Sequence, residues 1–421
     1  MKQAQPQITI VNSWHDDNKG DCGIVVGTIA ALKHCYPQAR FTLVSMFAED
    51  STFYSQGHRH LQQLFPNLSV VPSPCFSHDI AETPTIYQKA AKFLPIPRSL
   101  LFLGLSLGTR SPGLQALTAA DLVISSGGQY LRSRENQYKS LYIFYRLFYP
   151  LLVAQKYQIP YLFFSQSFEF DDPQRLDSRL MKVMGNRAIA VWARESLSKN
   201  ALQEIGILPE KVKLVPDAGL FVTPHQSDRV ISLLERHQLN SARFWAVTVK
   251  DCQFDTERLL SELTKAIEQL FAQNKIDRLV LISNSQGPTA VEDDRLVAKK
   301  LAQNLRGLPI VEIAEDLTPN ELSAIYGRAE FLIGTRFQSL ILALAAGTPV
   351  YGISYAGFKV LGLMELLAMP ELCSSLAYFA ADTILEQIEA LDLATLSKQI
   401  DERVKLLRQQ TIAAIDLLPI D

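Results

Sequence analysis

Short apolar runs alternate with longer stretches of helical periodicity along most of this chain. Residues 8–11 form the first run, an apolar helical pattern covers 24–36, and the next run is 41–45. Runs of this length are typical of buried strands, and a strand, a helix and a second strand in succession form a βαβ unit. The pattern therefore predicts an α/β fold with parallel sheets, which bind ligands at the carboxyl ends of their strands.

The same apolar character marks further predicted strands at 121–126, 161–165, 188–193, 244–249, 278–282, 331–333 and 350–354. Between them, the polar, proline-containing stretch 223–228 has the composition of a linker. We therefore predict two Rossmann-like α/β domains, residues 1–222 and 228–385, which face each other across a cleft. Residues 386–421 are predicted to form a helical segment that packs back on the first domain.

The block 331–359 combines a strand, a helix and a strand in the shortest span. Gly334 and Thr335 turn the chain after the first strand, which places Arg336 and Gln338 on the first helical turn. A helix N-terminus presents unpaired N–H groups and the positive end of the helix dipole, and arginine adds a forked cation. This predicts binding of phosphate or carboxylate; the alternative for Arg336 is an ion pair with a surface carboxylate.

Polar residues also follow the first predicted strand. Gly20 would let a ligand approach the main chain, and Asp21 could cap the helix that follows. His15, Asp16 and Asp17 could exchange protons in catalysis, but a solvated turn is the more common role for such a run.

Two later strand ends carry binding candidates as well. Gly127, Gly128 and Gln129 follow a predicted strand, where a glycine pair allows close approach by a ligand or by the next helix. Arg194 could hold a second anion or serve a structural role, and Lys250 ends a strand of the second domain.

Composition excludes several classes of function. A net charge of −2 and a pI near 6.4 give no electrostatic footprint for nucleic acid. The five cysteines lack a CxxC pair, which argues against a zinc site or a disulfide framework and favours a reducing cytoplasm. His58 and His60 form an H-x-H pair without a second ligand cluster, so a surface role is favoured over a metal site.

Two apolar stretches, 100–107 and 141–154, are candidates for a membrane span. Both fall short of about 20 residues, and the second is interrupted by Arg146 and Pro150. We expect both to lie in the core, with peripheral membrane contact left open by the tyrosines and phenylalanines of the second. The N-terminus lacks the order of a signal peptide, which favours a cytoplasmic protein.

Taken together, these motifs resemble those of the polysaccharide pyruvyl transferase family. The matching segments are the loop with Asn18, Gly20 and Asp21, DLVISSGG at 121–128, WARES at 192–196, VPD at 215–217, and the block 333–359. The resemblance implies the two-domain GT-B fold, with the first domain expected to bind the acceptor and the second the donor. It also implies transfer of pyruvyl from phosphoenolpyruvate to a sugar hydroxyl pair, which forms a ketal on a cell-surface glycan or its precursor.

The resemblance also assigns roles to individual residues. Arg194, Arg336 and the helix N-terminus at Thr335 would bind the phosphate and carboxylate of phosphoenolpyruvate, with Lys359 in the same block and no cofactor. The acceptor would be a glycan or a lipid-linked sugar. Members usually have histidine where this chain has Gln338, which cannot exchange a proton near neutral pH, and often arginine where it has Lys250.

A proton donor is still required, and His15, Asp16 and Asp17 are the nearest candidates in the sequence. Two other functions remain open. One is a GT-B glycosyltransferase that uses a nucleotide sugar; the other is a family member that binds an anionic ligand without turnover, which Gln338 favours.

Overall fold

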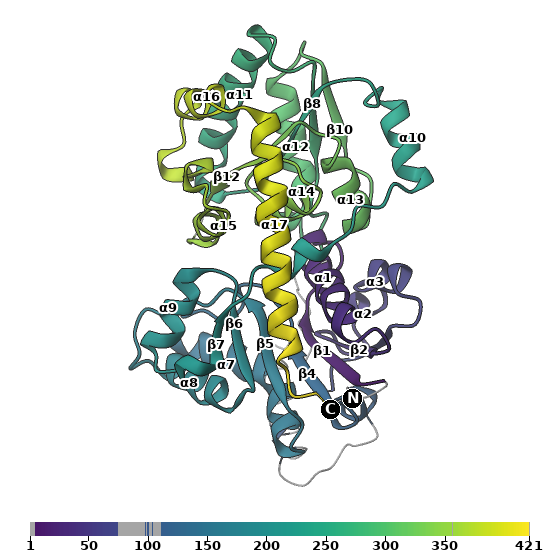
Figure 1. Cartoon of the computed structure of the whole chain (residues 1–421), viewed down its shortest axis with the longest axis vertical. Coiled ribbons are helices and arrows are strands. Elements are labelled where there is room, and N and C mark those ends of the chain that lie inside the picture. The colour runs from purple at the N-terminus through teal and green to yellow at the C-terminus, as the bar shows by residue number, and fades with distance from the viewer. Residues whose placement is uncertain are drawn as a thin grey trace. The chain divides into compact units, whose positions relative to one another are not determined.

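The computed structural model of the chain describes residues 5–74, 97, 99, 100, 103, 111–355 and 357–420. They form two compact α/β units, so the prediction of two Rossmann-like domains is confirmed (Figure 1). Unit 1 comprises Met1–Asp16, Thr28–Ala218 and Gln410–Asp421; unit 2 comprises Asp17–Gly27 and Gly219–Gln409. The division thus falls within two helices, α1 (Lys19–Cys35) and α17 (Leu393–Asp416).

Unit 1 is built on a seven-stranded sheet in which every pair of neighbours is parallel. Its order is β3-β2-β1-β4-β5-β6-β7. The strands are β1 (Gln7–Ser13), β2 (Arg40–Ser45), β3 (Ser69–Val71), β4 (Leu122–Ser125), β5 (Tyr161–Gln166), β6 (Ala190–Ala193) and β7 (Val212–Leu214). The strand order reverses between β1 and β4, and the loops that follow these two strands are the usual ligand position in such a sheet.

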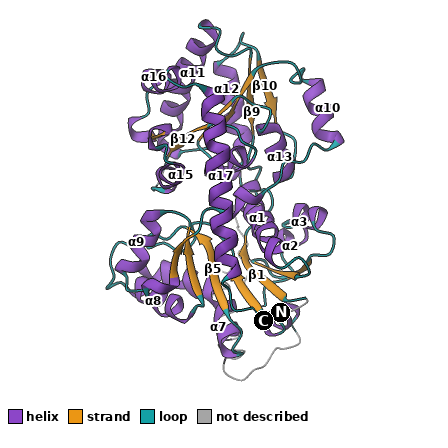
Figure 2. Cartoon of the chain, viewed as in Figure 1, coloured by secondary structure: helices purple, strands orange, loops and turns teal. Residues whose placement is uncertain are grey.

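Helices flank the sheet of unit 1 (Figure 2). Besides its part of α1 and α17, the unit has α2 (Thr52–Gln56), α3 (Arg59–Leu64), α6 (Pro112–Thr118), α7 (Gln137–Lys156), α8 (Leu176–Arg187) and α9 (Ser196–Glu204). The apolar stretch 141–154 lies in α7, whose Phe148 ring packs edge-on against Phe163 of β5 at 5.9 Å between centroids. This stretch is therefore core, as predicted.

Unit 2 contains a six-stranded parallel sheet with the order β10-β9-β8-β11-β12-β13. Its strands are β8 (Phe244–Thr248), β9 (Arg278–Ile282), β10 (Ile310–Ile313), β11 (Phe331–Gly334), β12 (Val350–Ser354) and β13 (Cys373–Ser375). Here the order reverses between β8 and β11, so the residues after these two strands lie at the switch point of the sheet.

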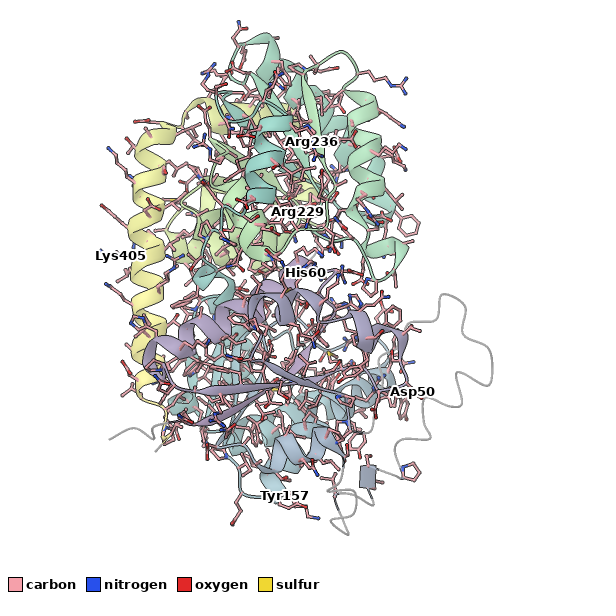
Figure 3. The ribbon with its side chains drawn as sticks, turned by 90° about the vertical axis from the view of Figure 1, so that its right-hand side faces the viewer. Asp50, His60, Tyr157, Arg229, Arg236 and Lys405 are labelled. Carbon is pink, nitrogen blue, oxygen red and sulfur yellow. The ribbon has the colours of Figure 1, made fainter. Side chains whose placement is uncertain are left out.

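The helices of unit 2 include one with a capping box at its start. Thr318 accepts a hydrogen bond from the Glu321 N–H, and the Glu321 carboxylate accepts one from the Thr318 N–H. The helices are α10 (Asp228–Arg236), α11 (Thr256–Ala272), α12 (Asp294–Asn304), α13 (Pro319–Tyr326), α14 (Phe337–Ala345), α15 (Lys359–Leu367) and α16 (Ala381–Glu389). The long helix α17 has an outer face that carries exposed residues such as Lys405 (Figure 3).

Two local predictions are wrong. Helix α1 begins at Lys19, several residues before the first apolar position, because Asn18 accepts a hydrogen bond from the Gly20 N–H and caps it. His58 and His60 lie at the start of α3 and are only 2% and 4% exposed, so they do not have the surface role that was favoured. Among the described residues, no group of three or more potential ligands could hold a metal ion.

Part of the sequence interpretation falls outside the described residues. This applies to residues 75–96, which include Cys75, and to residues 101, 102 and 104–107 of the first apolar stretch. In the part of the chain that is described, no helix has the length and apolar character needed to cross a membrane.

Candidate functional site

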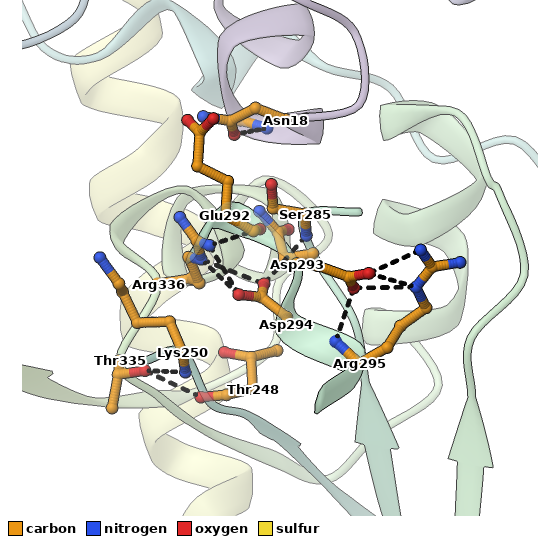
Figure 4. Close-up of polar contacts among 12 residues, drawn as sticks. Asn18, Thr248, Lys250, Ser285, Glu292, Asp293, Asp294, Arg295, Thr335 and Arg336 are labelled. Carbon is orange, nitrogen blue, oxygen red and sulfur yellow. Dashed lines mark hydrogen bonds and ion pairs between the residues drawn. The ribbon is translucent and has the colours of Figure 1, made fainter. Parts of the chain in front are cut away.

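Residues at the switch point of unit 2 are tied together by short hydrogen bonds. The Thr335 hydroxyl accepts a bond of 3.0 Å from the Lys250 N–H, and the Thr335 N–H donates one of 3.0 Å to the Thr248 carbonyl. Lys250 follows β8, while Thr335 and Arg336 follow β11. These bonds fix the position of Lys250 and Arg336 at neighbouring strand ends (Figure 4).

The next strand end adds a tyrosine between two lysines. Tyr355 follows β12, and the Lys250 Nζ lies 4.0 Å from the centroid of its ring. Lys359, at the start of α15, places its Nζ at 5.5 Å from the same centroid. We call Lys250, Arg336, Tyr355 and Lys359 the cationic cluster.

Nearby cations lower the pKa of the tyrosine in this cluster. Burial raises the pKa of the Tyr355 phenol, but Lys359, Lys250 and Arg336 outweigh this and hold the pKa below its ordinary value. Lys250 contributes both its charge and a side-chain hydrogen bond. Tyr355 is partly buried, so the three cations act on it through a medium that screens them less than bulk water does.

Arg336 is held by a buried carboxylate rather than by a surface one (Figure 4). Its Nε and Nη2 donate bonds of 2.6–3.0 Å to Asp294, which is 1% exposed, and Nη2 also donates to the Glu292 carbonyl. Burial alone would lower the pKa of Arg336, but the Asp294 carboxylate raises it above the usual value. Its Nη1 has no hydrogen bond within the described part of the chain and is available to a ligand.

Gln338 lies in the first turn of α14, against the first turn of α1. A Cβ atom built on Gly20 would come within 2.6 Å of the Gln338 Cβ and Cγ. A Cβ at Gly23 would lie 3.5 Å from Leu342, also on α14. The two helices pack closely because α1 carries glycines here, which explains why residues 17–27 belong to unit 2.

The loop residues before α1 mainly serve its attachment to unit 2. The Asn18 amide donates to the Asp21 carboxylate at 2.7 Å, so Asp21 supports the cap instead of forming it. The Asp17 carbonyl accepts a bond from the Gln286 N–H at 3.0 Å. Lys19 is buried and its Nζ lies 2.5 Å from the Asp316 carboxylate.

His15 and Asp16 belong to unit 1 and are not part of a solvated turn. His15 is 2% exposed and packs edge-on against Phe47 and Phe53. Asp16 is fully buried and accepts a hydrogen bond of 3.0 Å from the Leu61 N–H. These contacts favour structural roles for both residues, which with Asp17 were the nearest acid candidates in the sequence.

The other candidates of unit 1 are also engaged by protein groups. Gly128 has a φ of +129°, which residues with a side chain rarely adopt, and a Cβ atom here would clash with the Tyr130 ring. Glycine is therefore required by the backbone and its packing. The Gln129 amide donates to Glu169 at 3.2 Å. Arg194 is 4% exposed and donates to Ser167 at 2.7 Å and to Asp217 at 2.8 Å, as its structural alternative implies.

Unit 2 therefore brings together a subset of the predicted residues: Asp17, Asn18, Gly20, Asp21, Lys250, Thr335, Arg336, Gln338 and Lys359. His15, Asp16, Gly127, Gly128, Gln129 and Arg194 lie in unit 1. Sequence reasoning missed Tyr355 and Asp294. Tyr355 could have been found, since it stands directly after a predicted strand inside the block already singled out.

The chain is similar to proteins of one family. The sequence profile of the polysaccharide pyruvyl transferase family matches residues 57–357. The amylovoran biosynthesis protein AmsJ of Erwinia amylovora is 26% identical over 217 residues, which are 49% of this chain and 52% of that protein. The chain thus spans about half the length of this curated relative.

Solved structures share the fold along nearly the whole chain. HepE of Anabaena, in complex with UDP and glucose, superposes with a TM-score of 0.52 at 13% identity, covering 98% of this chain and 97% of its own. A glycosyltransferase of Rickettsia africae gives 0.56 at 13% identity, with 98% of each chain covered. UDP-GlcNAc 2-epimerase of Neisseria meningitidis gives 0.52 at 11% identity, with 97% and 100% covered. At these identities the likeness concerns the GT-B-like fold alone.

Proposed function

The chain belongs to the polysaccharide pyruvyl transferase family, and from this we propose that it transfers pyruvyl from phosphoenolpyruvate to two hydroxyls of a sugar. The product is a ketal on a cell-surface glycan or its precursor, and the acceptor is a glycan or a lipid-linked sugar. The name of AmsJ supports a role in polysaccharide biosynthesis. No cofactor is needed, because phosphoenolpyruvate itself carries the leaving phosphate.

The cationic cluster is the observation that carries this proposal. Phosphoenolpyruvate has a phosphate and a carboxylate, and both groups favour cations and backbone N–H donors. Lys250, Lys359 and the Nη1 of Arg336 supply the cations. We therefore assign both anionic groups of the donor to unit 2, and leave the acceptor to unit 1.

Lys250→Gln should weaken phosphoenolpyruvate binding by about 10-fold to 100-fold, because a charge-assisted contact contributes roughly 1.5–3 kcal/mol. Isothermal titration calorimetry measures the dissociation constant for phosphoenolpyruvate. The matched control is Lys405→Gln on the exposed face of α17, which should leave the affinity as in the wild type. Equal affinity in the Lys250 and Lys405 variants would remove Lys250 from the donor site.

We propose a cytoplasmic location, which the absence of any CxxC pair among the cysteines supports. The four cysteines within the described residues are free thiols. Contact with the inner face of a membrane would serve a lipid-linked acceptor, and flotation of the purified protein with anionic vesicles tests this.

The proposed reaction is tested with purified protein, phosphoenolpyruvate and a panel of sugar acceptors. Phosphate release that depends on the acceptor, with a pyruvylated product found by mass spectrometry, is the expected result. A parallel panel of nucleotide sugars tests the alternative that the fold neighbours suggest, since HepE is a structure with UDP and glucose. Consumption of a nucleotide sugar without phosphoenolpyruvate turnover would replace our proposal with a glycosyltransferase.

Gln338→His should change the rate of phosphate release less than about 10-fold if the wild type is active. The reason is that glutamine cannot exchange a proton, so a working enzyme must draw its acid from another residue, and a general acid contributes about 10² to 10⁴-fold. Rates of the two proteins are compared at saturating phosphoenolpyruvate. An inert wild type made active by histidine would instead identify a binding protein that has lost catalysis.

A further inference from the structure

The proposed reaction requires an acid close to the donor. The methylene carbon of phosphoenolpyruvate must gain a proton before a sugar hydroxyl can attack its neighbour. We propose that Tyr355 is the catalytic residue that donates this proton, an inference that rests on the proposed function. The geometry behind it is the placement of one phenol among three cations at the carboxyl ends of β8, β11 and β12.

Tyr355 lies where the donor anions would bind. The same lysines that would hold phosphate and carboxylate also face its ring, with Lys250 Nζ at 4.0 Å and Lys359 Nζ at 5.5 Å from the centroid. A ligand bound by those ammonium groups is therefore within reach of the phenol. The side chain is only partly buried, so a ligand has access to it.

The surroundings also suit the chemistry of the phenol. Losing a proton leaves a phenolate, and Lys250, Lys359 and Arg336 stabilise that negative charge. Their combined effect lowers the pKa of Tyr355 despite its burial. The lower pKa is closer to neutral pH, where a general acid is most effective.

The other groups near the cluster are less suited to this role. Asp294 is buried and occupied by Arg336. Asp251 accepts hydrogen bonds from Thr256 and Gln253, which stabilise its charged form and lower its pKa. Burial raises the pKa of the Cys252 thiol to about 11, so it is a weaker acid than an ordinary thiol.

The step balances without any further reactant. The Tyr355 O–H bond breaks, its proton forms the third C–H bond of the new methyl group, and the adjacent carbon becomes electrophilic. One sugar hydroxyl adds to that carbon and returns its proton to the phenolate. The carbon–oxygen bond to phosphate then breaks with its electron pair on the phosphate, the second hydroxyl closes the ketal, and the proton of that hydroxyl leaves with the phosphate.

Tyr355→Phe tests this role because it keeps the ring between the lysines and removes only the hydroxyl. We expect kcat for phosphate release to fall by about 10² to 10⁴-fold, while the dissociation constant for phosphoenolpyruvate stays within about 3-fold. The wild type should lose activity at alkaline pH as the phenol ionises, below the ordinary value of about 10. The residual activity of the phenylalanine variant should not show this alkaline limb of the pH–rate profile.

Tyr351→Phe is the matched control, on the strand that precedes Tyr355. It removes a hydroxyl that donates to Gln387 at 2.7 Å, away from the cluster, and should leave kcat and its pH profile unchanged. Wild-type turnover equalled by Tyr355→Phe, or an alkaline limb retained by that variant, would overturn the role of Tyr355 alone. A wild type that releases no phosphate with any acceptor would overturn the proposed function and this role with it.

Discussion

Arg336→Ala should lower the free energy of unfolding of unit 2 by about 3–5 kcal/mol, the usual cost of breaking a buried ion pair. The Asp294 carboxylate, only 1% exposed, would lose the guanidinium that neutralises it and three of its hydrogen bonds. Urea denaturation gives the size of the change. Hydrogen exchange followed by mass spectrometry localises it, and faster exchange should be confined to peptides of unit 2.

The chain contains a matched control next to the buried aspartate. Arg295 pairs with Asp293 through bonds of 2.6–3.1 Å, but its side chain is 45% exposed. Exposed pairs contribute about 0–1 kcal/mol, so Arg295→Ala should change stability little. Equal losses in the two variants would show that burial does not set the strength of the Arg336 pair.

A binding defect at Arg336 can have two structural causes. A loss of phosphoenolpyruvate affinity in Arg336→Ala could come from unfolding of the site as well as from the missing Nη1 contact. Arg336→Met combined with Asp294→Leu removes both charges, and such replacements are often neutral or stabilising. A stable double variant that still binds weakly would assign the loss to the contact itself.

Acid should destabilise unit 1 through His58. Burial, together with the nearby His15, lowers the pKa of His58 to about 3, and its Nδ1 has no hydrogen-bond partner among the described residues. The unfolded chain binds a proton at this site below pH 6.5, while the folded chain does not until about pH 3. Stability from the neutral ring is therefore complete above pH 6.5 and is lost as the pH falls toward 3.

At pH 4.5 this site alone should cost about 3 kcal/mol relative to pH 7, since each pKa unit corresponds to about 1.4 kcal/mol. His58→Gln keeps a polar group for the Ser45 hydroxyl, which lies 2.8 Å from the His58 Nε2, and cannot titrate. Its loss of stability between pH 7 and 4.5 should be smaller than that of the wild type by this amount. His225→Gln, at an exposed position, should behave as the wild type, and the same pH dependence in all three proteins would contradict the prediction.

Patterns that are local in the sequence predicted most of the fold. Period and length of apolar runs located the strands at 278–282 and 350–354 with the bounds that the structure has. The capping box at Thr318 was readable because its two partners are three residues apart. Helix α1 was placed too late, since its first turns are polar and gain their stability from packing on α14.

The site was less predictable because its partners are distant in the chain. Asp294 and Arg336 are separated by 42 residues, and no spacing in the sequence links them. Placing Tyr355 beside Lys250 requires the order of β8, β11 and β12 in the sheet, which the sequence does not state. The burial of His58 and His60 likewise depends on which face of a short helix meets the core.

Unit 1 is assembled from segments that lie far apart in the chain, and this affects how it folds during synthesis. Its last segment, Gln410–Asp421, supplies the buried side chains of Ile415 and Ile420, and the Ile412 carbonyl contacts the Cys35 thiol at 3.8 Å. During synthesis the ribosome must translate Gly219–Gln409 before that segment exists, which takes about 10–40 s at 5–20 residues per second. Over that interval the nascent unit 1 exposes apolar surface that the finished chain covers, which makes it a client for chaperones that bind emerging polypeptides.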